Sequence, residues 1–553
     1  MRWLKTHNSH RLEDRAPDEA NHHKLHELSN LDQTPRPQTQ QEHPQIVYNR
    51  KVVLPVVFSL CLAIFLTALD RTIIGVTIPA ISNDFQSFDD IAWYESAYLL
   101  TFAAFQLPLD LLPRKTHLHI PYPPLRTRLH PLRRRPNLTP PPFILGRALA
   151  GLGSAGNITG ANVILADLVP LSKRPKYQGF IGATFGLASI AGPLLGGVFA
   201  TRVSWRWCFW INVPIGGVAL GVLAMLVPLR PAAQSQAGKT PGQRLRAYDP
   251  IGTALLVPGL VLVLLALQWG SSGSPWASAR VLGTLVVGIV LVLCFGISQF
   301  WAGENGTLPP RIMRERSIVA GSAVSLGFGS TLIIVTFFMP IWYQAIKGVE
   351  AIDAGLRMLG YFLITVVFVI ASGIAVSKTG YYTPWMIGGT ALLTVGCGLL
   401  TTLEVDSSTA TSIGFQLMTG TGMGLTLSQP LNAAQTVLSR SDIPLGITII
   451  NFGNFVGGTI FVSICQALLS STLRAQLSAK IPGLDVSKLS SVGATDLARL
   501  VEPGQLGLLR EAYNEGVRKV WYVALGVSVF AFVAAWGVEW KSVKRKVEVR
   551  EVV

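Results

Sequence analysis

Charged side chains are rare in the apolar segments of this chain, so those that occur there are the first candidates for chemistry. Asp70 and Arg71 stand at the outer end of the first apolar segment, and Arg147 stands in "GRALAGLGSAG". An ionisable side chain in a membrane span is costly to bury and is a functional candidate by default. Arg147 needs an acidic partner, polar backbone or water. Alternatively, Asp70 and Arg71 cap a helix at the interface, and Arg147 makes a structural ion pair or extends toward water.

The segment "GPLLGG" has a composition that would shape a membrane helix. It contains Gly192, Pro193, Gly196 and Gly197. Proline removes a backbone donor and bends a helix, whereas glycines let neighbouring helices approach closely. Ordinary glycine packing is the alternative.

Polar and aromatic side chains on inward faces are the candidates for a substrate pocket. They are Trp93, Tyr94, Tyr98, Gln106, Tyr343, Gln344, Gln429, Asn432, Gln435 and Asn451. Because aromatic residues also populate interfacial belts, Trp93 and Tyr343 have that alternative. Asn454 is a further candidate of this kind, but we interpret the segment "NFGNFVGG", which contains it, as helix packing rather than ligand binding.

The composition requires that membrane helices position these residues. Of the 553 residues, 50% are hydrophobic and 14% are charged, whereas soluble domains carry about 25% charged residues. The apolar residues come in blocks of about twenty, the length that crosses a bilayer as a helix. Residues 281–301 and 360–376 are examples. We therefore predict an all-α polytopic membrane protein.

About thirteen spans can be recognised by length and composition. The first two cover approximately residues 52–72 and 93–112, and the others begin near Phe143, Tyr177, Trp207, Asp249, Val281, Ser317, Leu356, Trp385, Ser412, Leu445 and Trp521.

Lysine and arginine predict the topology, because short cytoplasmic loops are enriched in them. Cations gather in the C-terminal tail and in alternate loops such as "SKRPK" and "PPRIMRER", whereas "SNDFQSFDD" has none. Both termini are therefore expected in the cytoplasm, and the long loop 471–520 is expected outside. The net charge of +16 is attributed largely to these loops, and we expect no nucleic-acid partner.

The segment "HIPYPPLRTRLHPLRRRPN" contradicts this topology. The spans before and after it must both run inward, so one crossing is missing between Pro113 and Pro142. Five arginines between Arg126 and Arg135 would cost on the order of 15 kcal/mol in a membrane, at about 3 kcal/mol each. Residues 113–142 are interpreted as an out-of-frame segment, since a one-base shift with permissible codons yields an apolar helix. The alternatives are a basic arm for nucleic acid or nuclear import, and an external N-terminal tail.

Four motifs occur in order along the chain: "LTALDRTIIGVTIPAI", "ILGRALAGLGSAG", "GLASIAGPLLGG" and "SWRWCFWINVPIGG". Over residues 51–546 the chain resembles the major facilitator superfamily, specifically the fourteen-span drug:proton antiporter family of fungal multidrug and toxin efflux pumps. The resemblance implies two six-helix bundles with two extra helices between them, the third span being corrupted here. It also implies proton coupling at Asp70 and Arg147, and identifies "GPLLGG" as the antiporter motif of exporters.

The expected organisation follows from these boundaries. Residues 1–50 form a disordered cytoplasmic tail, 51–229 the N-terminal bundle, 230–301 a cytoplasmic loop and the two extra spans, 302–540 the C-terminal bundle with the external loop 471–520, and 541–553 a cytoplasmic tail.

The leading functional hypothesis is proton-coupled efflux of amphipathic organic compounds, such as drugs or a secondary-metabolite toxin, by alternating access around a midplane site. An importer or vacuolar transporter of siderophores or basic amino acids, and an inactive pseudotransporter or receptor, are the alternatives.

Several function classes lack support in the sequence. It has no Walker phosphate loop and no cluster with catalytic or metal-ligand spacing, so no enzyme activity, cofactor or metal is expected. Each cysteine lies in a different apolar block, and we interpret all of them as small core residues. The expected partners are a small-molecule substrate, protons and membrane lipid. A monomer in the plasma membrane is expected, with the vacuolar membrane as the alternative.

Overall fold

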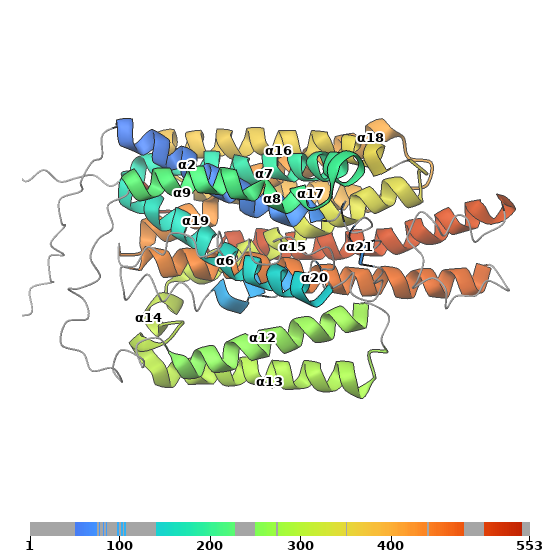
Figure 1. Ribbon diagram of the computed structural model, residues 1–553, viewed down its shortest axis with the longest axis horizontal. Coiled ribbons are helices and arrows are strands. Elements are labelled where there is room, and N and C mark those ends of the chain that lie inside the picture. Colours follow the sequence, from blue (N-terminus) through green and yellow to red (C-terminus); the bar gives the residue numbers. More distant parts are fainter. Residues whose placement is uncertain are drawn as a thin grey trace, which may run out of the picture. The chain divides into compact units, whose positions relative to one another are not determined.

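Helices make up the architecture of the computed structural model (Figure 1). The structure describes residues 50–74, 140–226, 249–271, 275–349, 351–439, 442–480 and 503–544, together with isolated positions from 77 to 106. Ten helices among these residues are long and apolar enough to cross a membrane. The prediction of an all-α polytopic membrane protein is confirmed.

The first group of helices comes from the N-terminal part of the chain. It comprises α2 (Arg50–Thr72), α6 (Pro140–Leu168), the 3-10 turn η1 (Leu171–Lys173), α7 (Arg174–Val198), the π-helical turn η2 (Phe199–Val203), α8 (Trp207–Trp210) and α9 (Asn212–Leu226). Helix α2 packs against α6, α7 and α9. The expected spans near residues 52, 143, 177 and 207 therefore exist as helices, whereas most of the span 93–112 lies outside the described residues.

The second group comes from the C-terminal part. It comprises α14 (Pro310–Met313), α15 (Arg316–Ala345), α16 (Ala351–Thr379), α17 (Thr383–Leu400), α18 (Thr409–Thr426), α19 (Gln429–Val437), α20 (Ile443–Lys480), the 3-10 turn η6 (Pro503–Gln505) and α21 (Leu506–Ala535). The span expected near Ser412 is divided into α18 and α19, with Pro430 in the first turn of α19, where a missing backbone donor costs nothing.

The expected external loop 471–520 begins and ends with helical residues. Helix α20 continues to Lys480 and α21 begins at Leu506, which leaves residues 481–502 outside the described part. The polar residues at these helix ends suggested a loop, but apolar faces persist through them: Leu477 and Leu509 are buried. The burial of these leucines between α20 and α21 stabilises the helices beyond the expected boundaries.

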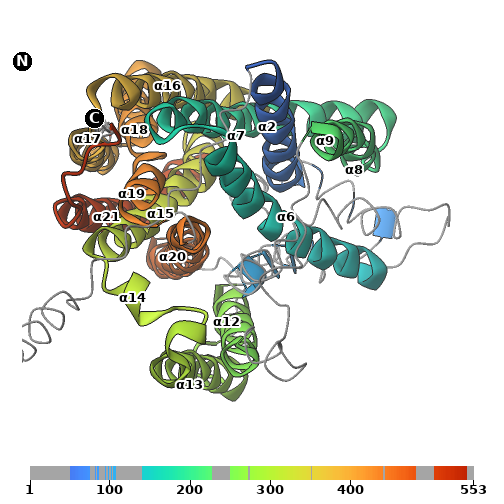
Figure 2. The same ribbon diagram turned by 90° about the vertical axis from the view of Figure 1, so that its left-hand side faces the viewer.

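Helices α12 (Pro250–Ser271) and α13 (Ala279–Ala302) lie where spans were expected near Asp249 and Val281. They lie side by side, and α12 also contacts α20 (Figure 2). The other face of α13 is exposed, including Leu293 and Cys294. The prediction that all cysteines lie in the core is therefore wrong for Cys294; Cys208, Cys397 and Cys465 are buried.

A buried carboxylate fixes the start of this pair of helices. Asp249 precedes α12 with a positive φ of 47° and accepts hydrogen bonds from Gln299 Nε2 (2.8 Å), Thr307 N (2.9 Å), Thr307 Oγ1 (2.8 Å) and Gly252 N (2.9 Å). Burial alone would raise the pKa of Asp249, but these donors together hold it below its ordinary value. The network ties α12, α13 and the residue Thr307, which follows the turn η3 (Gly303–Asn305), into one unit.

A glycine seam joins the two groups of helices through α7 and α16. A Cβ atom on Gly373 would lie 2.5 Å from the carbonyl oxygen of Pro175, and one on Gly179 would lie 3.0 Å from that of Val369. Toward the opposite end, a Cβ on Gly186 would lie 2.6 Å from Val366 Cγ2. Because Pro175 opens α7 whereas Gly373 is near the end of α16, the two helices run antiparallel along this seam.

The C-terminal segment returns across the end of the second group. The amide of Val543 donates to Gly380 O (2.8 Å), Tyr381 and Ser542 form an isolated antiparallel bridge, and Val538 and Val543 are each 1% exposed. Glu539 N donates to Ser317 Oγ (3.2 Å). We name residues 536–544 the C-terminal strap; it joins α15, the α16–α17 turn and α21.

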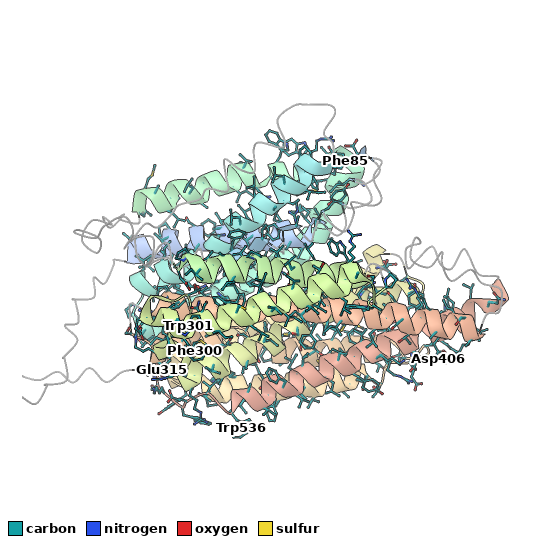
Figure 3. All side chains as sticks on the ribbon, turned by 90° about the horizontal axis from the view of Figure 1, so that it is seen from below. Phe85, Phe300, Trp301, Glu315, Asp406 and Trp536 are labelled. Atoms are coloured by element: carbon teal, nitrogen blue, oxygen red, sulfur yellow. The ribbon has the colours of Figure 1, made fainter. Side chains whose placement is uncertain are left out.

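Exposed aromatic side chains mark one end of the helices. Figure 3 shows Trp301, Glu315 and Trp536 at one end and Phe85 and Asp406 at the opposite end. Trp301 and Trp536 are 86% and 58% exposed, as expected for an interfacial belt. The cation-rich "PPRIMRER" and the C-terminal strap share that end, which agrees with their placement on one membrane side.

Candidate functional site

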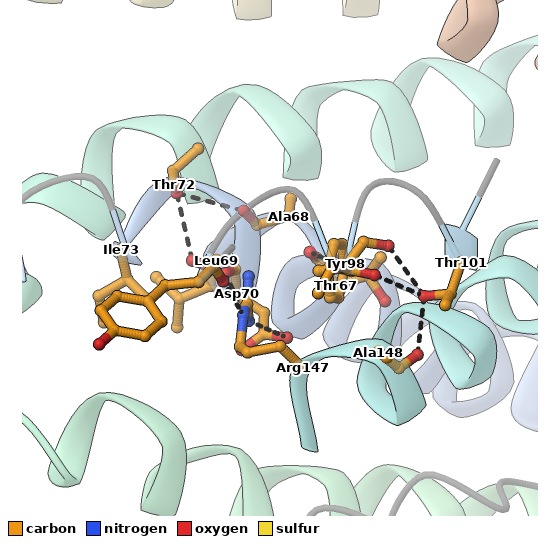
Figure 4. A network of polar contacts seen from close by, with 12 residues as sticks. Thr67, Ala68, Leu69, Asp70, Thr72, Ile73, Tyr98, Thr101, Arg147 and Ala148 are labelled. Atoms are coloured by element: carbon orange, nitrogen blue, oxygen red, sulfur yellow. Dashed lines mark hydrogen bonds and ion pairs between the residues drawn. The ribbon is translucent and has the colours of Figure 1, made fainter. Parts of the chain in front are cut away.

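Two of the three charged residues singled out in the sequence form an ion pair. Arg147 Nη1 lies 3.3 Å from Asp70 Oδ2, and the two side chains are 3% and 2% exposed. Arg147 Nε also donates to the backbone carbonyl of Tyr94 (2.8 Å), and the guanidinium lies 4.6 Å from the ring centroid of Tyr98 (Figure 4). The acid that Arg147 required is thus Asp70, and Asp70 is not an exposed helix cap.

Small residues on α6 allow this pair to form. A Cβ atom on Gly151 would lie 2.2 Å from the carbonyl oxygen of Tyr98, so the helix backbones touch. Thr101 Oγ1 donates to Ala148 O (2.7 Å) one turn away. On the other side of α6, Asn157 Nδ2 donates to Thr67 Oγ1 (2.7 Å) and to Ala63 O (2.9 Å) on α2. The motif "GRALAGLGSAG" therefore holds Arg147 at a fixed depth between its neighbours.

The segment "GPLLGG" packs against the end of α2 that carries Asp70. A Cβ atom on Gly192 would lie 2.1 Å from Thr72 Oγ1, and one on Gly196 would lie 3.0 Å from Ile73 Cγ1. Thr72 Oγ1 also donates to Ala188 O on α7 (3.2 Å). A Cβ on Gly197 meets nothing within 4 Å, and Pro193 lies in α7 without a described side chain. Gly192 and Gly196 fix the approach of α7 to α2, two residues past Asp70.

The pocket candidates of the early segment fall into different surroundings. Trp93 lies outside the described residues. Tyr94 is fully buried, with its ring 5.4 Å from that of Phe143 in an aromatic cluster, so packing accounts for it. Tyr98 stacks on Phe102 at 6.2 Å beneath Arg147. Gln106 is 1% exposed, and its amide nitrogen and oxygen have no hydrogen-bond partner within the described part.

Tyr343 belongs to a polar cluster at the far end of α15. Its hydroxyl lies 2.7 Å from Ser412 Oγ and accepts a hydrogen bond from Gln416 Nε2 (2.8 Å). Arg357 lies over its ring at 5.3 Å. Gln344, the neighbouring candidate, is half-buried on α15. The sequence reading missed Gln416, although its spacing of four residues from Ser412 places both on one helical face.

The remaining candidates lie on α19 and α20. Gln429 is already engaged, since its Nε2 donates to Leu425 O (2.9 Å) and its Oε1 accepts from Asn432 (3.1 Å). Gln435 is 3% exposed and both its amide atoms are unpartnered among the described residues. Asn451 likewise has an unpartnered Nδ2. Buried amides of this kind cost about 1–3 kcal/mol each, which favours Gln435 and Asn451 as ligand contacts.

The segment "NFGNFVGG" packs helices, as its composition indicated. A Cβ atom on Gly453 would lie 2.7 Å from Ser322 O, and one on Gly457 would lie 2.4 Å from Leu326 O. Conversely, the backbone carbonyl of Asn454 would lie 2.1 Å from a Cβ on Gly329. These contacts press α20 against α15.

A second arginine was noted in the sequence but not assigned to the site. Arg71 on α2 lies 5.1 Å from the ring centroid of Phe455 on α20 and 5.9 Å from that of Phe185 on α7. Arg71 follows Asp70 in the sequence, but consecutive residues on a helix point about 100° apart. The two side chains therefore face different neighbours. Aromatic residues of two other helices, Phe455 and Phe185, show what Arg71 faces among the described residues.

Comparisons with known proteins agree on one family. Residues 136–462 match the family model described as Major Facilitator Superfamily. "MFS-type efflux pump MFS1" of Trichophyton rubrum is 41% identical over 496 residues, covering 89% of this chain and 92% of that protein. "Rubrofusarin-specific efflux pump aurT" of Gibberella zeae is 38% identical over 495 residues, covering 88% and 90%.

A solved structure shares the fold. The proton:xylose symporter XylE has a TM-score of 0.52 and 13% identity, covering 90% of this chain and 99% of that one. At this identity the likeness concerns the arrangement of helices alone.

Proposed function

The chain belongs to the major facilitator superfamily, and we propose that it couples the export of amphipathic organic compounds to the inward movement of protons. It is an efflux transporter: relatives that match nearly its whole length are named efflux pumps. A secondary-metabolite toxin or a drug is the proposed substrate class. The family consists of transporters, so we propose no enzymatic activity.

The buried pair of Asp70 and Arg147 carries the proposal for proton coupling. A carboxylate and a guanidinium at 3% exposure or less are costly to bury, and ionisable residues inside a membrane protein mark functional sites by default. A proton arriving at Asp70 would neutralise the carboxylate and weaken its hold on Arg147, so that α2 and α6 could separate. Because Gly192 and Gly196 attach α7 to the same end of α2, such a change would reach the seam with α16. The four residues 192, 193, 196 and 197 are proposed to act as this mechanical link.

We propose that the substrate binds between the two groups of helices near the midplane. The unpartnered amides of Gln106, Gln435 and Asn451 support this site. Tyr98 is proposed to contribute through its place beneath Arg147, whereas Tyr94, Gln429 and Tyr343 are already engaged by neighbouring side chains. The protein is proposed to act as a monomer in the plasma membrane.

An export assay tests the direction and the coupling together. Cells that express the chain from its native cDNA are loaded with the dyes rhodamine 6G and fluorescein, and the external medium is acidified. Faster dye loss than in cells expressing the Asp70→Asn variant supports proton antiport. Dye accumulation on external acidification would identify an importer. Dye loss at a rate that does not depend on the pH gradient would contradict proton coupling.

We propose that residues 113–142 are read out of frame. Two contacts support this. Tyr94 lies beside Phe143 and Arg147, and Phe102 packs in one cluster with Ala155, so the described positions between 94 and 106 follow α6 in the same direction. Two successive spans with one direction require another crossing between them. The family match begins at residue 136, near the end of this segment.

Sequencing the native transcript tests the reading frame. We expect it to encode an apolar span of about twenty residues where "HIPYPPLRTRLHPLRRRPN" is printed, preceded by a short basic turn. A transcript that encodes the printed segment, and whose product exports a dye, would contradict the proposal.

The proposed topology has its own test. A cysteine at position 485, outside the described residues, should react with an impermeant thiol reagent in intact cells. Protection of this cysteine from the reagent would contradict the proposal that the loop lies outside.

A further inference from the structure

We propose that Arg71, Phe455 and Phe102 form a binding site for planar aromatic acids. The aromatic ring of the ligand would stack against the phenylalanines while its carboxylate or phenolate group faces the guanidinium. The inference deepens the proposed function and rests on it, since it names the substrate class of the same transport path.

The position of Arg71 is the first observation. Its guanidinium lies over Phe455 of α20 at 5.1 Å and over Phe185 of α7 at 5.9 Å. Helices α2 and α7 belong to the first group, whereas α20 belongs to the second, so the guanidinium lies where the two groups meet. Arg71 is half-buried. A guanidinium inside a membrane protein marks a functional site by default, and its planar fork both stacks on rings and binds carboxylates in bidentate fashion.

The aromatic surface beside Arg71 spans both groups of helices. Phe455 contacts Phe102 edge to face at 4.3 Å between ring centroids. Phe102 is 1% exposed, while Phe455 is half-buried. Edge-to-face and offset-stacked ring pairs are both favourable, by about 0.5–1.5 kcal/mol beyond area burial. A flat aromatic ligand can therefore replace one of these ring contacts without leaving the phenylalanines unsatisfied.

Unpartnered amides stand one helical turn from these rings. Gln106 follows Phe102 by four residues, and Asn451 precedes Phe455 by four residues on α20. Residues four apart lie on one helical face. Both side chains carry amide atoms that have no hydrogen-bond partner among the described residues. Ring oxygens of an aromatic acid would accept hydrogen bonds there.

The same rings reach the proton site. Phe102 stacks on Tyr98, and Tyr98 lies beneath the guanidinium of Arg147 at 4.6 Å. A ligand that displaces Phe102 would thus move the surface on which Arg147 rests. Organic cations would instead meet the guanidinium of Arg71 and be repelled by it.

Two dyes of one ring system test the inference. Fluorescein is a xanthene acid, and rhodamine 6G is a xanthene cation. Binding is measured by fluorescence anisotropy with the full chain purified after expression from its native cDNA. We expect saturable fluorescein binding that weakens at least tenfold in Arg71→Gln and less in Arg71→Lys, with rhodamine 6G binding unchanged or stronger. Arg206→Gln is the matched control, because Arg206 also stacks on a ring, Trp205 at 4.4 Å, but its side chain is 34% exposed.

The aromatic part has its own comparison. Phe455→Leu keeps an apolar side chain but removes the ring, and should weaken fluorescein binding about fivefold. Phe337→Leu, at a position 46% exposed and next to Phe338, should leave it unchanged. Thermal unfolding confirms that each variant is folded; if Arg71→Gln does not fold, Arg71→Lys carries the comparison.

The outcomes separate the inference from the proposed function. Absence of saturable fluorescein binding, equal affinity in Arg71→Gln, or an equal loss of rhodamine 6G binding overturns the inference, even if either dye is exported. Fluorescein binding that depends on Arg71 supports the binding site. This holds even if the export rate does not depend on the pH gradient, an outcome that would contradict only the proposal of proton coupling.

Discussion

Replacing Arg147 by alanine should destabilise the protein severely and abolish pH-driven export. The side chain is 3% exposed and its partner Asp70 is 2% exposed, so the variant leaves a buried carboxylate without its guanidinium. Removing one member of a buried ion pair costs about 3–5 kcal/mol, a large part of a typical stability of about 5–15 kcal/mol. Arg147→Lys keeps the charge but loses the fork that also reaches Tyr94 O at 2.8 Å. It should cost about 1.5–3 kcal/mol, the loss of one charge-assisted hydrogen bond.

A second ion pair of the same chain provides the control. Arg206 Nη2 lies 2.9 Å from Asp84 Oδ2, closer than the 3.3 Å of the buried pair, but the two side chains are 34% and 43% exposed. Exposed pairs contribute about 0–1 kcal/mol. Distance alone would rank Arg206→Ala as the more damaging change, whereas burial ranks Arg147→Ala first.

The buried cysteines supply the assay. Cys208, Cys397 and Cys465 are buried, so a dye that fluoresces on reacting with thiols reports thermal unfolding. The double variant Asp70→Asn with Arg147→Ala should be less destabilised than the sum of the single variants, because it removes both charges. Arg206→Ala should unfold and export almost as the unmodified chain does.

The reasoning fails if Arg147→Ala unfolds at the unmodified temperature, or if it exports dye in response to a pH gradient at a near-normal rate and equal surface level. In the first case the pair contributes no net stability. In the second case Arg147 is structural and the proton acts elsewhere.

Other parts of the structure give further tests. Gly192→Ala should lose transport and about 1–3 kcal/mol of stability through overpacking, because its Cβ would lie 2.1 Å from Thr72 Oγ1, whereas Gly197→Ala should be tolerated; equal unfolding temperatures would refute this. Asp249, whose folded-state pKa is held below its ordinary value, contributes stability that is present above the unfolded pKa of about 3.9 and is lost as pH falls through the folded pKa. The unfolding temperature of the unmodified chain should therefore exceed that of Asp249→Asn at pH 7 and approach it on acidification; a constant difference would contradict the network. Val543→Asp should release the C-terminal strap and cost about 2–3 kcal/mol of stability, since Val543 is 1% exposed and burying an apolar side chain contributes about that much. Trp540→Ala, at 61% exposure, should change the unfolding temperature little. If Trp540→Ala lowers the unfolding temperature more than Val543→Asp does, the strap does not stabilise the fold.

The sequence by itself determined the class of protein, because apolar length and charge depletion in a membrane depend on local composition. Blocks of about twenty apolar residues predicted helices that exist as α2, α13, α15 and α16. The motifs around Asp70, Arg147 and Gly192 similarly predicted the family. The end of α20 was harder, because burial of Leu477 depends on a neighbour that lies beyond the local sequence.

Tertiary structure decided the partners. The sequence required an acid for Arg147 but could not select Asp70, which lies 77 residues away, because the choice depends on how close α6 packs against α2. It grouped Tyr94 and Gln106 as pocket candidates, although one packs in an aromatic cluster and the other retains unpartnered amide atoms. It also placed Arg71 beside Asp70 without showing that Arg71 faces Phe455 of a distant helix. Hydrogen-bond satisfaction and ring contacts arise only when helices are brought together, since each side chain finds its partners across a helix interface rather than along its own segment.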